Sequence, residues 1–429
     1  MSISWAGGIS AKWLSACAHD ATLFFCSRNR GFQRIVRLRS PVKPSAKDSR
    51  VRLISTLLVV GLAITVSPAF AADPVRIGVT TILSGPNADR GQSEQYGVEL
   101  ALQRVNASGG VLGRPVEAFY ADNAADPATG IAAANRLIGQ QHVSVLLGAL
   151  ATPVTRAVMP VANAAKVPFV IDISAGQEFV DLAGTGGYDY VFKTSPSDGD
   201  VATAMTQWLK ARNVKRIVIL ADDNDFNRAN AAAMEKAATA AHIETLASET
   251  VAKGTVDLVP SVKRLKALQP DRIVTFLGVS SGAFFRAYEQ IGGGTPLAGR
   301  IDFMAAIANL SPGFVAAGGL DRAVGISVFT PSASGSGVRA FVAAYREKYG
   351  LAPTQRSVFA FEATELVVDA IRRANSDDPV AVQRALRSTQ MPSMLGGTFA
   401  MDEHNHAHVM MQIVGIRGGA LAVLERAGK

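Results

Sequence analysis

Residues 143–155 have the sequence VSVLLGALATPVT, which contains a strand, a turn and the start of a helix. The apolar run at 143–147 is typical of a parallel strand that is buried on both faces, and Gly148 ends it. Thr152 at an N-cap followed by Pro153 at the first helical position is a strong helix-entry signal. A helix therefore begins just past a strand's carboxyl end, where open α/β sheets bind ligands and free backbone N–H groups attract anions. The plainer interpretation is that Thr152 only caps this helix.

The formal net charge of +8 over 429 residues comes from the N-terminal part of the chain. Residues 1–71 hold ten Lys and Arg residues against two Asp and Glu residues, which leaves 33 residues of each sign in 72–429. The body of the protein is therefore formally neutral, and its charge gives no support for nucleic-acid binding.

A secretory signal is indicated by the apolar run at 53–66 (LISTLLVVGLAITV), which follows basic residues at 47–52. Ala69 and Ala71 supply the small residues that signal peptidase requires. The alternative is a membrane anchor, but the run of fourteen residues is shorter than the roughly 20 that span a bilayer. We therefore predict cleavage after Ala71 and a periplasmic product.

The body that follows the leader is expected to contain no disulfide, because both cysteines, Cys17 and Cys26, fall within the leader. Its 358 residues exceed what one hydrophobic core usually serves. Two domains are therefore expected.

Strand and helix patterns alternate along the body. Strands of a first lobe are expected at 75–80, 115–120, 143–147 and 167–171. The pattern breaks at 192–198 (FKTSPSD) and then restarts. Strands of a second lobe are expected at 216–220, 243–250 and 271–277. The alternation predicts an α/β protein with two Rossmann-like lobes, each built on a parallel sheet.

A second crossing between the lobes is indicated by the Ser, Gly and Pro residues at 330–338 (TPSASGSGV). A closing hairpin is predicted from 398–401 and 409–416. The predicted boundaries are 1–71 for the leader, 72–195 and 331–390 for lobe I, and 196–330 and 391–429 for lobe II. Two lobes joined by several crossings would hinge around a cleft.

Residues 278–282 (GVSSG) match the nucleophile-elbow pattern G-x-S-x-G between a strand and a helix. With Ser280 as nucleophile, Asp369 and a downstream histidine would complete a triad. The same residues also suit an ordinary Gly/Ser turn of a Rossmann-like sheet, and no HGGG-type oxyanion segment precedes them. We favour the turn and keep a secreted serine hydrolase as an alternative function.

His404, His406 and His408 alternate, so on a strand they would share one face and could approach a metal ion. The surrounding MDEHNHAH also has the polar, Asn-containing character of a turn. We favour an exposed turn and predict no metal site. Neither G-x-G-x-x-G after the first strand nor G-x-x-x-x-G-K-[ST] occurs, so no cofactor is predicted.

Charged residues follow two of the expected strands. Arg90 lies in the loop after the first strand, and Asp222, Asp223 and Asp225 follow a strand of lobe II. Each could be solvated, and the aspartates could cap the next helix. Their position at the carboxyl ends of strands makes them candidates for ligand contacts.

Six segments occur in a characteristic order and spacing. They are IGVTTILSGPNADRGQ (77–92), GVELALQRVNASGGVLGRPVE (97–117), YADNAADPATGIAAANRLI (120–138), LLGALATPVT (146–155), VFKTSPSD (191–198) and VPSVKRLKALQPDRIV (259–274). Together they resemble the periplasmic leucine/isoleucine/valine-binding protein family, the type I solute-binding proteins of ABC importers. The resemblance runs from about Val75 to the C-terminus, and it implies two α/β lobes joined by a three-crossing hinge.

The resemblance also implies a binding site. In this family the ligand's carboxylate is held by hydroxyls and backbone N–H groups after the third and fourth strands of lobe I. These positions correspond here to Ala151, Thr152, Ser174 and Ala175. The remaining ligand-binding residues that it implies are Ser84 and Arg90 in the first loop, and Phe226 and Ser280 in lobe II.

Several of these positions depart from the family pattern. Arg90 replaces an aromatic residue, Phe226 replaces a tyrosine, and the next aromatic of lobe II falls near 279–280. Amino-acid binders place a glutamate for the ammonium where this chain has Ala306 and Ile307. One missing acid and one added cation shift the expected ligand toward carboxylates that lack an α-amine. Branched-chain or other apolar amino acids are the alternative.

The predicted function is that of a non-enzymatic extracytoplasmic binding protein that closes two lobes on a small carboxylate-bearing solute. It would deliver this solute to the ABC permease in the inner membrane and act as a monomer. Besides the hydrolase, the alternative is a ligand-sensing subunit of a signalling system, which shares the fold and differs in its partner.

Overall fold

The computed structural model describes residues 73–331, 335–417 and 420–427. The predicted leader and its cleavage site lie outside these residues, as does the centre of the predicted second crossing, at 332–334. Within the described part of the chain, no helix is both long enough and apolar enough to cross a bilayer.

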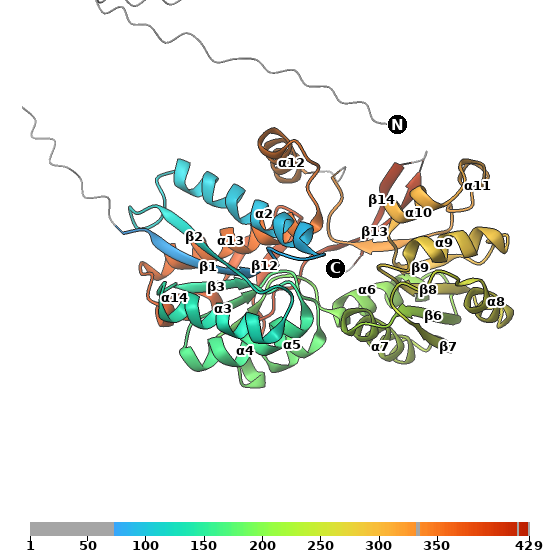
Figure 1. Cartoon of the computed structure of the whole chain (residues 1–429), viewed down its shortest axis with the longest axis horizontal. Helices are drawn as coiled ribbons and strands as arrows, with labels where there is room; N and C mark the ends of the chain where they lie inside the picture. Colours follow the sequence, from blue (N-terminus) through green and yellow to red (C-terminus); the bar gives the residue numbers. More distant parts are fainter. Residues whose placement is uncertain (1–72, 332–334, 418–419, 428–429) are drawn as a thin grey trace, which may run out of the picture. The chain divides into compact units, whose positions relative to one another are not determined.

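Lobe I is built on a five-stranded parallel sheet in the order β2-β1-β3-β4-β5 (Figure 1). Its strands are β1 (Val75–Thr81), β2 (Val116–Asp122), β3 (Val145–Gly148), β4 (Phe169–Ile171) and β5 (Val191–Lys193). The four strands predicted for this lobe are confirmed, and β5 is an additional one. Chain order and strand order differ as they do in a doubly wound sheet, which confirms the predicted fold class.

The helices of lobe I come from two distant parts of the sequence. They are α2 (Ala88–Ala107), α3 (Pro127–Gly139), α4 (Thr152–Ala165), α5 (Gln177–Leu182), the short η2 (Gly184–Gly186), α12 (Ser336–Tyr349), α13 (Gln355–Ala374) and α14 (Pro379–Arg387). Helix α13 packs along α2 although the whole second lobe separates them in the sequence (Figure 1). Gly97 permits this packing, because a Cβ there would lie 2.2 Å from the Ser357 carbonyl oxygen.

Lobe II repeats the same architecture with a four-stranded parallel sheet in the order β7-β6-β8-β9. Its strands are β6 (Arg216–Asp222), β7 (Glu244–Val251), β8 (Arg272–Phe276) and β9 (Leu297–Arg300). Its helices are α6 (Asp198–Lys210), α7 (Asp225–Ala240), α8 (Val259–Ala267), α9 (Ser281–Gln290), α10 (Phe303–Asn309) and α11 (Pro312–Ala316). The three strands predicted here correspond to β6, β7 and β8, which confirms a second parallel sheet.

The predicted closing hairpin is wrong. Strand β12 (Thr398–Ala400) pairs with β11 (Gln390–Pro392), whereas β13 (Met411–Arg417) pairs with β10 (Gly325–Ser327) and β14 (Ala420–Ala427). Between β11 and β12 lie Gly396 and Gly397, whose φ values of +105° and +78° permit a tight turn. This glycine pair therefore joins β12 to the strand before it rather than to the strand after it.

Three connecting segments of the chain run between lobe I and lobe II: residues 194–197 between β5 and α6, 328–335 between β10 and α12, of which 332–334 are not described, and 401–410 between β12 and β13. The third connection begins beside lobe I, because Lys193 N donates to Asn405 O at 2.9 Å and Ala407 N donates to Lys193 O at 2.9 Å. We therefore propose that the last lobe boundary lies near residue 409 rather than at 391. The boundaries at 195 and 330 stay predictions.

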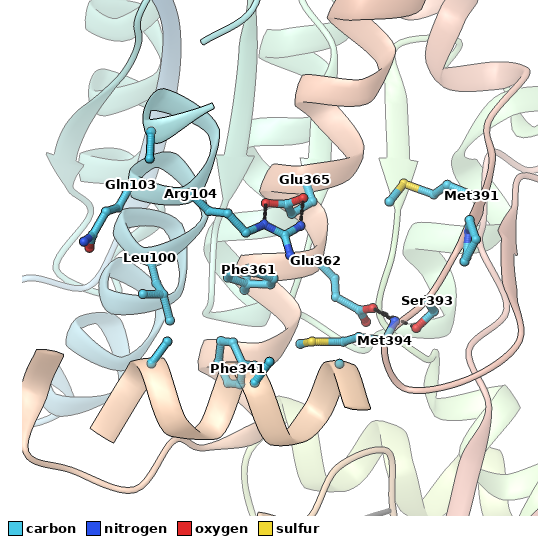
Figure 2. A pocket seen from close by; sticks show the side chains of 15 residues that line it. Leu100, Gln103, Arg104, Phe341, Phe361, Glu362, Glu365, Met391, Ser393 and Met394 are labelled. Carbon is cyan, nitrogen blue, oxygen red and sulfur yellow. Dashed lines mark hydrogen bonds and ion pairs between the residues drawn. The ribbon is translucent and has the colours of Figure 1, made fainter. Parts of the chain in front are cut away.

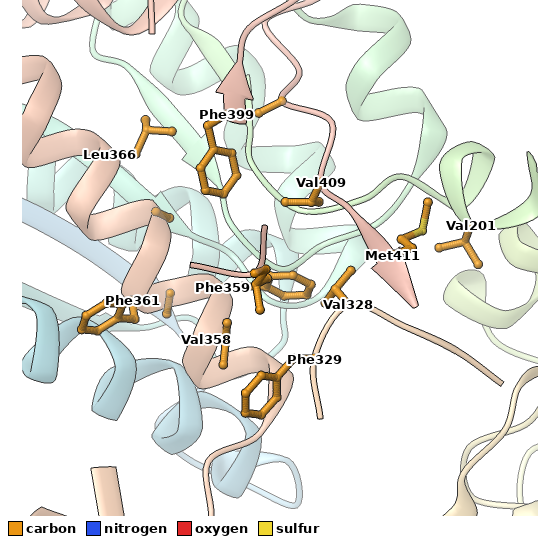
Figure 3. Close-up of a cluster of buried hydrophobic side chains, with 14 of the residues drawn as sticks. Val201, Val328, Phe329, Val358, Phe359, Phe361, Leu366, Phe399, Val409 and Met411 are labelled. Carbon is orange, nitrogen blue, oxygen red and sulfur yellow. The ribbon is translucent and has the colours of Figure 1, made fainter. Parts of the chain in front are cut away.

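A single buried cluster forms where the connections meet α13 (Figure 3). Val328 comes from the second connection and Val409 from the third, and both belong to the same apolar cluster as Phe359 of α13 and Val201 of α6. Burial of apolar surface contributes about 25 cal/mol per Å². It therefore stabilises the packing of these connections, in addition to their backbone hydrogen bonds.

Candidate functional site

The turn from β3 to α4 is the centre of the predicted site. The N-cap is Ala151, with extended backbone angles, and Thr152 is the first helical residue. No side chain caps this helix, and the hydroxyl of Thr152, a residue that is 6% exposed, makes no hydrogen bond among the described residues. The prediction that Thr152 is the N-cap is therefore wrong by one position, and so is the plainer interpretation that it only caps the helix. The N–H groups of Thr152 and Val154 have no intrahelical acceptor and remain available.

Ser174, which follows β4, is adjacent to this turn. Its hydroxyl lies 2.7 Å from the Thr155 hydroxyl, and it donates to the carbonyl oxygens of Ala149 at 2.9 Å or Leu150 at 3.0 Å. Ala175 is buried next to it. The structure thus brings the ends of β3 and β4 together, as the sequence predicted for Ala151, Thr152, Ser174 and Ala175.

A group of buried ionisable residues that the sequence analysis missed lies behind this turn. Glu94 of α2 is fully buried and accepts a hydrogen bond from the Thr81 hydroxyl, and a Cβ on Gly148 would lie 3.5 Å from its Oε1. Burial raises the pKa of Glu94 well above its usual range, and the charge of Asp172 raises it further. Burial also raises the pKa of Asp172. At least one of these two carboxyls therefore keeps its proton at neutral pH.

Lys193, at the end of β5, is the cation of this region. It is fully buried, and its Nζ donates to the Ser174 carbonyl oxygen and, at 2.8 Å, to the Ser195 hydroxyl. Burial lowers the pKa of Lys193 to about 7. The sequence did contain a signal for these two buried residues, because each is a charged residue at a position where the pattern is apolar. Glu94 lies on the same helix face as Val98, and Lys193 is the last residue of a buried strand.

The first loop places two predicted residues at the surface. Ser84 and Arg90 are both exposed, and Arg90 belongs to the first turn of α2. A second guanidinium lies near it: burial lowers the pKa of Arg356, at the start of α13, and the positive charge of Arg90 lowers it further. Sequence reasoning missed Arg356, because α13 is distant from α2 along the chain.

Lobe II contributes Phe226 but not the Ser280 side chain. Phe226, on α7, is 36% exposed and lies under the Arg300 guanidinium, 5.3 Å from the ring centroid. Ser280 is 1% exposed, and its hydroxyl accepts a hydrogen bond from Gly254 N at 3.1 Å. Its neighbour Val279 is 61% exposed. Ser280 therefore holds the loop after β7, and the residue of this turn that faces solvent is Val279.

The nucleophile elbow is not formed. A serine at such an elbow sits on a strained turn, whereas Ser280 has φ −81° and ψ 0°, an ordinary helical conformation. The hydroxyl is buried and hydrogen-bonded, as described above. The structure therefore does not support Ser280 as the nucleophile of the hydrolase alternative.

The three aspartates after β6 all have partners within lobe II. Asp222 is fully buried, and its Oδ2 accepts the N–H of Gly278 at 2.7 Å and that of Ser280 at 3.4 Å. Asp223 and Asp225 both form ion pairs with Arg228, the latter at 2.6 Å. Asp225 also lies 3.7 Å from Arg156 of α4, so this contact joins the two lobes.

The predicted turn is present at residues 403–405, but it is not exposed throughout. His406 is 1% exposed, and its Nε2 lies 2.7 Å from Asp200 Oδ2. His408 is exposed but lies 3.3 Å from the other oxygen of the same carboxylate. Asp200 comes more than 200 residues earlier in the chain, so no local sequence pattern could have revealed this partner.

A cavity of about 570 Å³ lies elsewhere in lobe I, between α2, α12, α13 and residues 391–394 (Figure 2). Its walls are mostly apolar, with an ion pair between Arg104 and Glu365 on one side and the Glu362 carboxyl on another. None of the eight predicted ligand-binding residues lines it. The cavity is therefore distinct from the predicted site at the carboxyl ends of the strands.

Comparison with known proteins identifies the family. The model of the family described as periplasmic binding protein matches residues 74–420. The chain belongs to this family. Relatives include "Leu/Ile/Val-binding protein homolog 7" of Brucella abortus, which is 25% identical over 368 residues, covering 80% of this chain and 89% of the relative.

Solved structures share the same fold. A solute-binding protein of an ABC transporter from R. palustris, in complex with benzoate, superposes with a TM-score of 0.69 at 20% identity, covering 83% of this chain and 98% of its own. The branched-chain amino acid transporter protein LivJ from Streptococcus pneumoniae, in complex with isoleucine, gives 0.68 at 22% identity, covering 82% and 100%.

Membership of this family confirms the resemblance that the six sequence segments indicated. The family consists of periplasmic solute-binding proteins of ABC transporters, which bind small molecules and work with a permease. The protein is therefore a binding protein rather than an enzyme, and the comparisons give no support to a hydrolase or a signalling subunit.

Proposed function

We propose that this binding protein takes a small carboxylate-bearing solute between its two lobes and passes it to an ABC permease of the inner membrane. The observation that carries the proposal is the uncapped N-terminus of α4, next to the carboxyl end of β4. We further propose that the mature chain begins after Ala71 and acts as a monomer in the periplasm.

Several features of lobe I favour an anionic group. The N–H groups of the first turn of α4 and the positive end of its dipole suit a carboxylate. Thr152 adds a hydroxyl that has no partner among the described residues. Arg90 and Arg356 bring two guanidinium groups near the same end of the sheet, and guanidinium binds carboxylates in bidentate geometry.

The charges of lobe II give little support for an α-ammonium group. Ala306 is buried and apolar at the position where amino-acid binders place a glutamate, and Ile307 follows it. Asp222 accepts hydrogen bonds from backbone N–H groups, and Asp223 and Asp225 form ion pairs with Arg228. Burying an ammonium without a counter-charge is costly. We therefore favour aromatic or aliphatic acids without an amine, with apolar amino acids as the alternative.

The relatives are compatible with both ligand classes, since benzoate is bound in one similar structure and isoleucine in another. A panel of paired ligands tests the choice: leucine with 4-methylpentanoate, and phenylalanine with 3-phenylpropanoate, each measured by calorimetry on the purified protein. We expect the deaminated acid of each pair to bind about tenfold or more tightly, a difference of about 1.4 kcal/mol. Tighter binding of the amino acid in both pairs would show that an ammonium partner exists.

The substitution Thr152→Val is expected to weaken binding of the best ligand in that panel by about 1 to 3 kcal/mol, because a desolvated carboxylate oxygen loses its hydrogen bond. The melting temperature without ligand should change little, since the hydroxyl caps nothing. Calorimetry and thermal unfolding measure the two effects. Thr239→Val, on the far end of α7, is the matched control. An equal loss of melting temperature with and without ligand would contradict a binding role.

A further inference from the structure

The cluster formed by Asp200, His406 and His408 lies outside the proposed ligand site and joins the start of α6 to the third connection. Asp200 is in the first turn of α6, which packs against α7 and β14 of lobe II. His406 and His408 are in the third connection, and His406 forms a parallel bridge with Lys193 at the end of β5. The two parts of the cluster thus come from segments about 200 residues apart in the chain.

One ligand atom from each of the three side chains lies within 4.8 Å of the other two. His406 Nε2 is 2.7 Å from Asp200 Oδ2, and His408 Nδ1 is 3.3 Å from Asp200 Oδ1. The carboxylate is fixed in this position, because Ser197 donates to it through its backbone N–H at 2.7 Å and its hydroxyl at 2.8 Å.

The second nitrogen of each imidazole has an acceptor of its own. His406 Nδ1 lies 3.3 Å from the Lys193 carbonyl oxygen, and His408 Nε2 lies 3.1 Å from Asp402 Oδ2. Without a metal ion, the 2.7 Å contact to Asp200 places an N–H of His406 on Nε2. A metal ion would displace this proton, and the Lys193 carbonyl oxygen would then accept an N–H from Nδ1. Metal-binding histidines typically have this arrangement, with the outer N–H donated to a carbonyl or carboxylate.

We propose that Asp200, His406 and His408 bind a divalent transition-metal ion, with Zn²⁺ as the best-matched candidate. Two imidazole nitrogens and one carboxylate oxygen are a common three-residue set for Zn²⁺, and a water molecule would complete a tetrahedron. Bonds of about 2.0 Å place tetrahedral ligand atoms about 3.3 Å apart, which is the separation between His408 Nδ1 and Asp200 Oδ1. Mg²⁺ and Ca²⁺ prefer all-oxygen sets, so two histidines disfavour them.

A metal ion here would link the start of α6 to the third connection. These two segments also share the buried apolar cluster that contains Val201 and Val409. The ion would therefore hold the third connection against the start of α6, and its binding energy would stabilise the folded chain in proportion to the logarithm of the free metal concentration. Such a role is independent of which solute the protein binds.

The test is a Zn²⁺ titration of the purified, metal-stripped protein carrying no polyhistidine tag, in competition with a chromophoric chelator. We expect one equivalent of Zn²⁺ to bind and to raise the melting temperature. His408→Ala should weaken Zn²⁺ binding about tenfold or more, and it should fold normally because the side chain is exposed. Co²⁺ bound by the unmodified protein should give the visible absorption of a tetrahedral site, and Zn²⁺ should abolish it.

Two controls distinguish a built site from non-specific binding by histidines. His404→Ala changes a histidine of the same loop that lies outside the cluster, and His242→Ala changes one in lobe II. Both variants should bind Zn²⁺ like the unmodified protein. The proposal is overturned if the unmodified protein binds no Zn²⁺ at micromolar concentration, if His408→Ala binds it equally well, or if His404→Ala loses as much affinity as His408→Ala.

Discussion

The substitution Gly148→Ala is expected to lower the free energy of unfolding by about 3 to 5 kcal/mol, a large fraction of the stability of a typical protein. Gly148 has φ +115°, which side chains rarely adopt, and a Cβ there would lie 2.1 Å from the Thr80 carbonyl oxygen. Neither strand can move away, because Gly148 is paired with Thr80 of β1 and with Ile171 of β4. Urea denaturation followed by far-ultraviolet circular dichroism measures the change.

Gly187→Ala is the matched control for this prediction. Gly187 has φ +109°, close to that of Gly148, but a Cβ there would have no atom within 4 Å. Gly187→Ala should therefore lower the free energy of unfolding only by the cost of its backbone conformation, about 1 kcal/mol. If the two variants lose the same stability, the close approach of β1 to β3 makes no contribution.

The apolar runs and helix-entry signals were sufficient to predict most of both sheets from sequence. Asp126 followed by Pro127 is a helix-entry signal of this kind, and the structure has Asp126 as the N-cap, accepting from Thr129 N, and Pro127 as the first residue of α3. At Thr152 the same signal was wrong by one residue, because proline is accepted at either of the first two helical positions and Ala151 already has the extended backbone of an N-cap.

The parts that sequence did not predict depend on contacts between distant segments. The burial of His406 requires Lys193 of β5 and Asp200 of α6, which lie more than 200 residues earlier in the chain. Arg356 approaches Arg90 only because α13 returns to pack on α2. Ser280 was assigned to the site from the resemblance, but its hydroxyl accepts a hydrogen bond from the backbone N–H of Gly254 in a neighbouring loop. Local periodicity carries no information about such partners, and therefore predicts elements better than sites.

Glu362, on α13, has an environment that predicts a strong pH dependence of stability. It is buried in the wall of the cavity in lobe I, where its Oε1 accepts the Ser393 hydroxyl at 2.8 Å and Met394 N at 2.7 Å (Figure 2). Its Oε2 is buried without a partner among the described residues. Burial raises the pKa of Glu362 to about 7. The folded protein therefore keeps this proton up to about pH 7, whereas the unfolded chain loses it near pH 4.5.

Between these two values the folded state binds more protons than the unfolded state, so the contribution of Glu362 to stability falls as pH rises from about 4.5 to about 7. The fall amounts to about 3 kcal/mol at 1.36 kcal/mol per pH unit.

Glu362→Gln keeps the acceptor for Ser393 and Met394 but cannot ionise, so the variant should match the unmodified protein near pH 4.5 and exceed its stability by about 3 kcal/mol at pH 8. Urea denaturation across this range measures the difference. Glu347→Gln, at an exposed position of α12, should leave the profile unchanged. Parallel profiles for Glu362→Gln and the unmodified protein would mean that water reaches the Glu362 carboxyl through the cavity and lets it ionise freely.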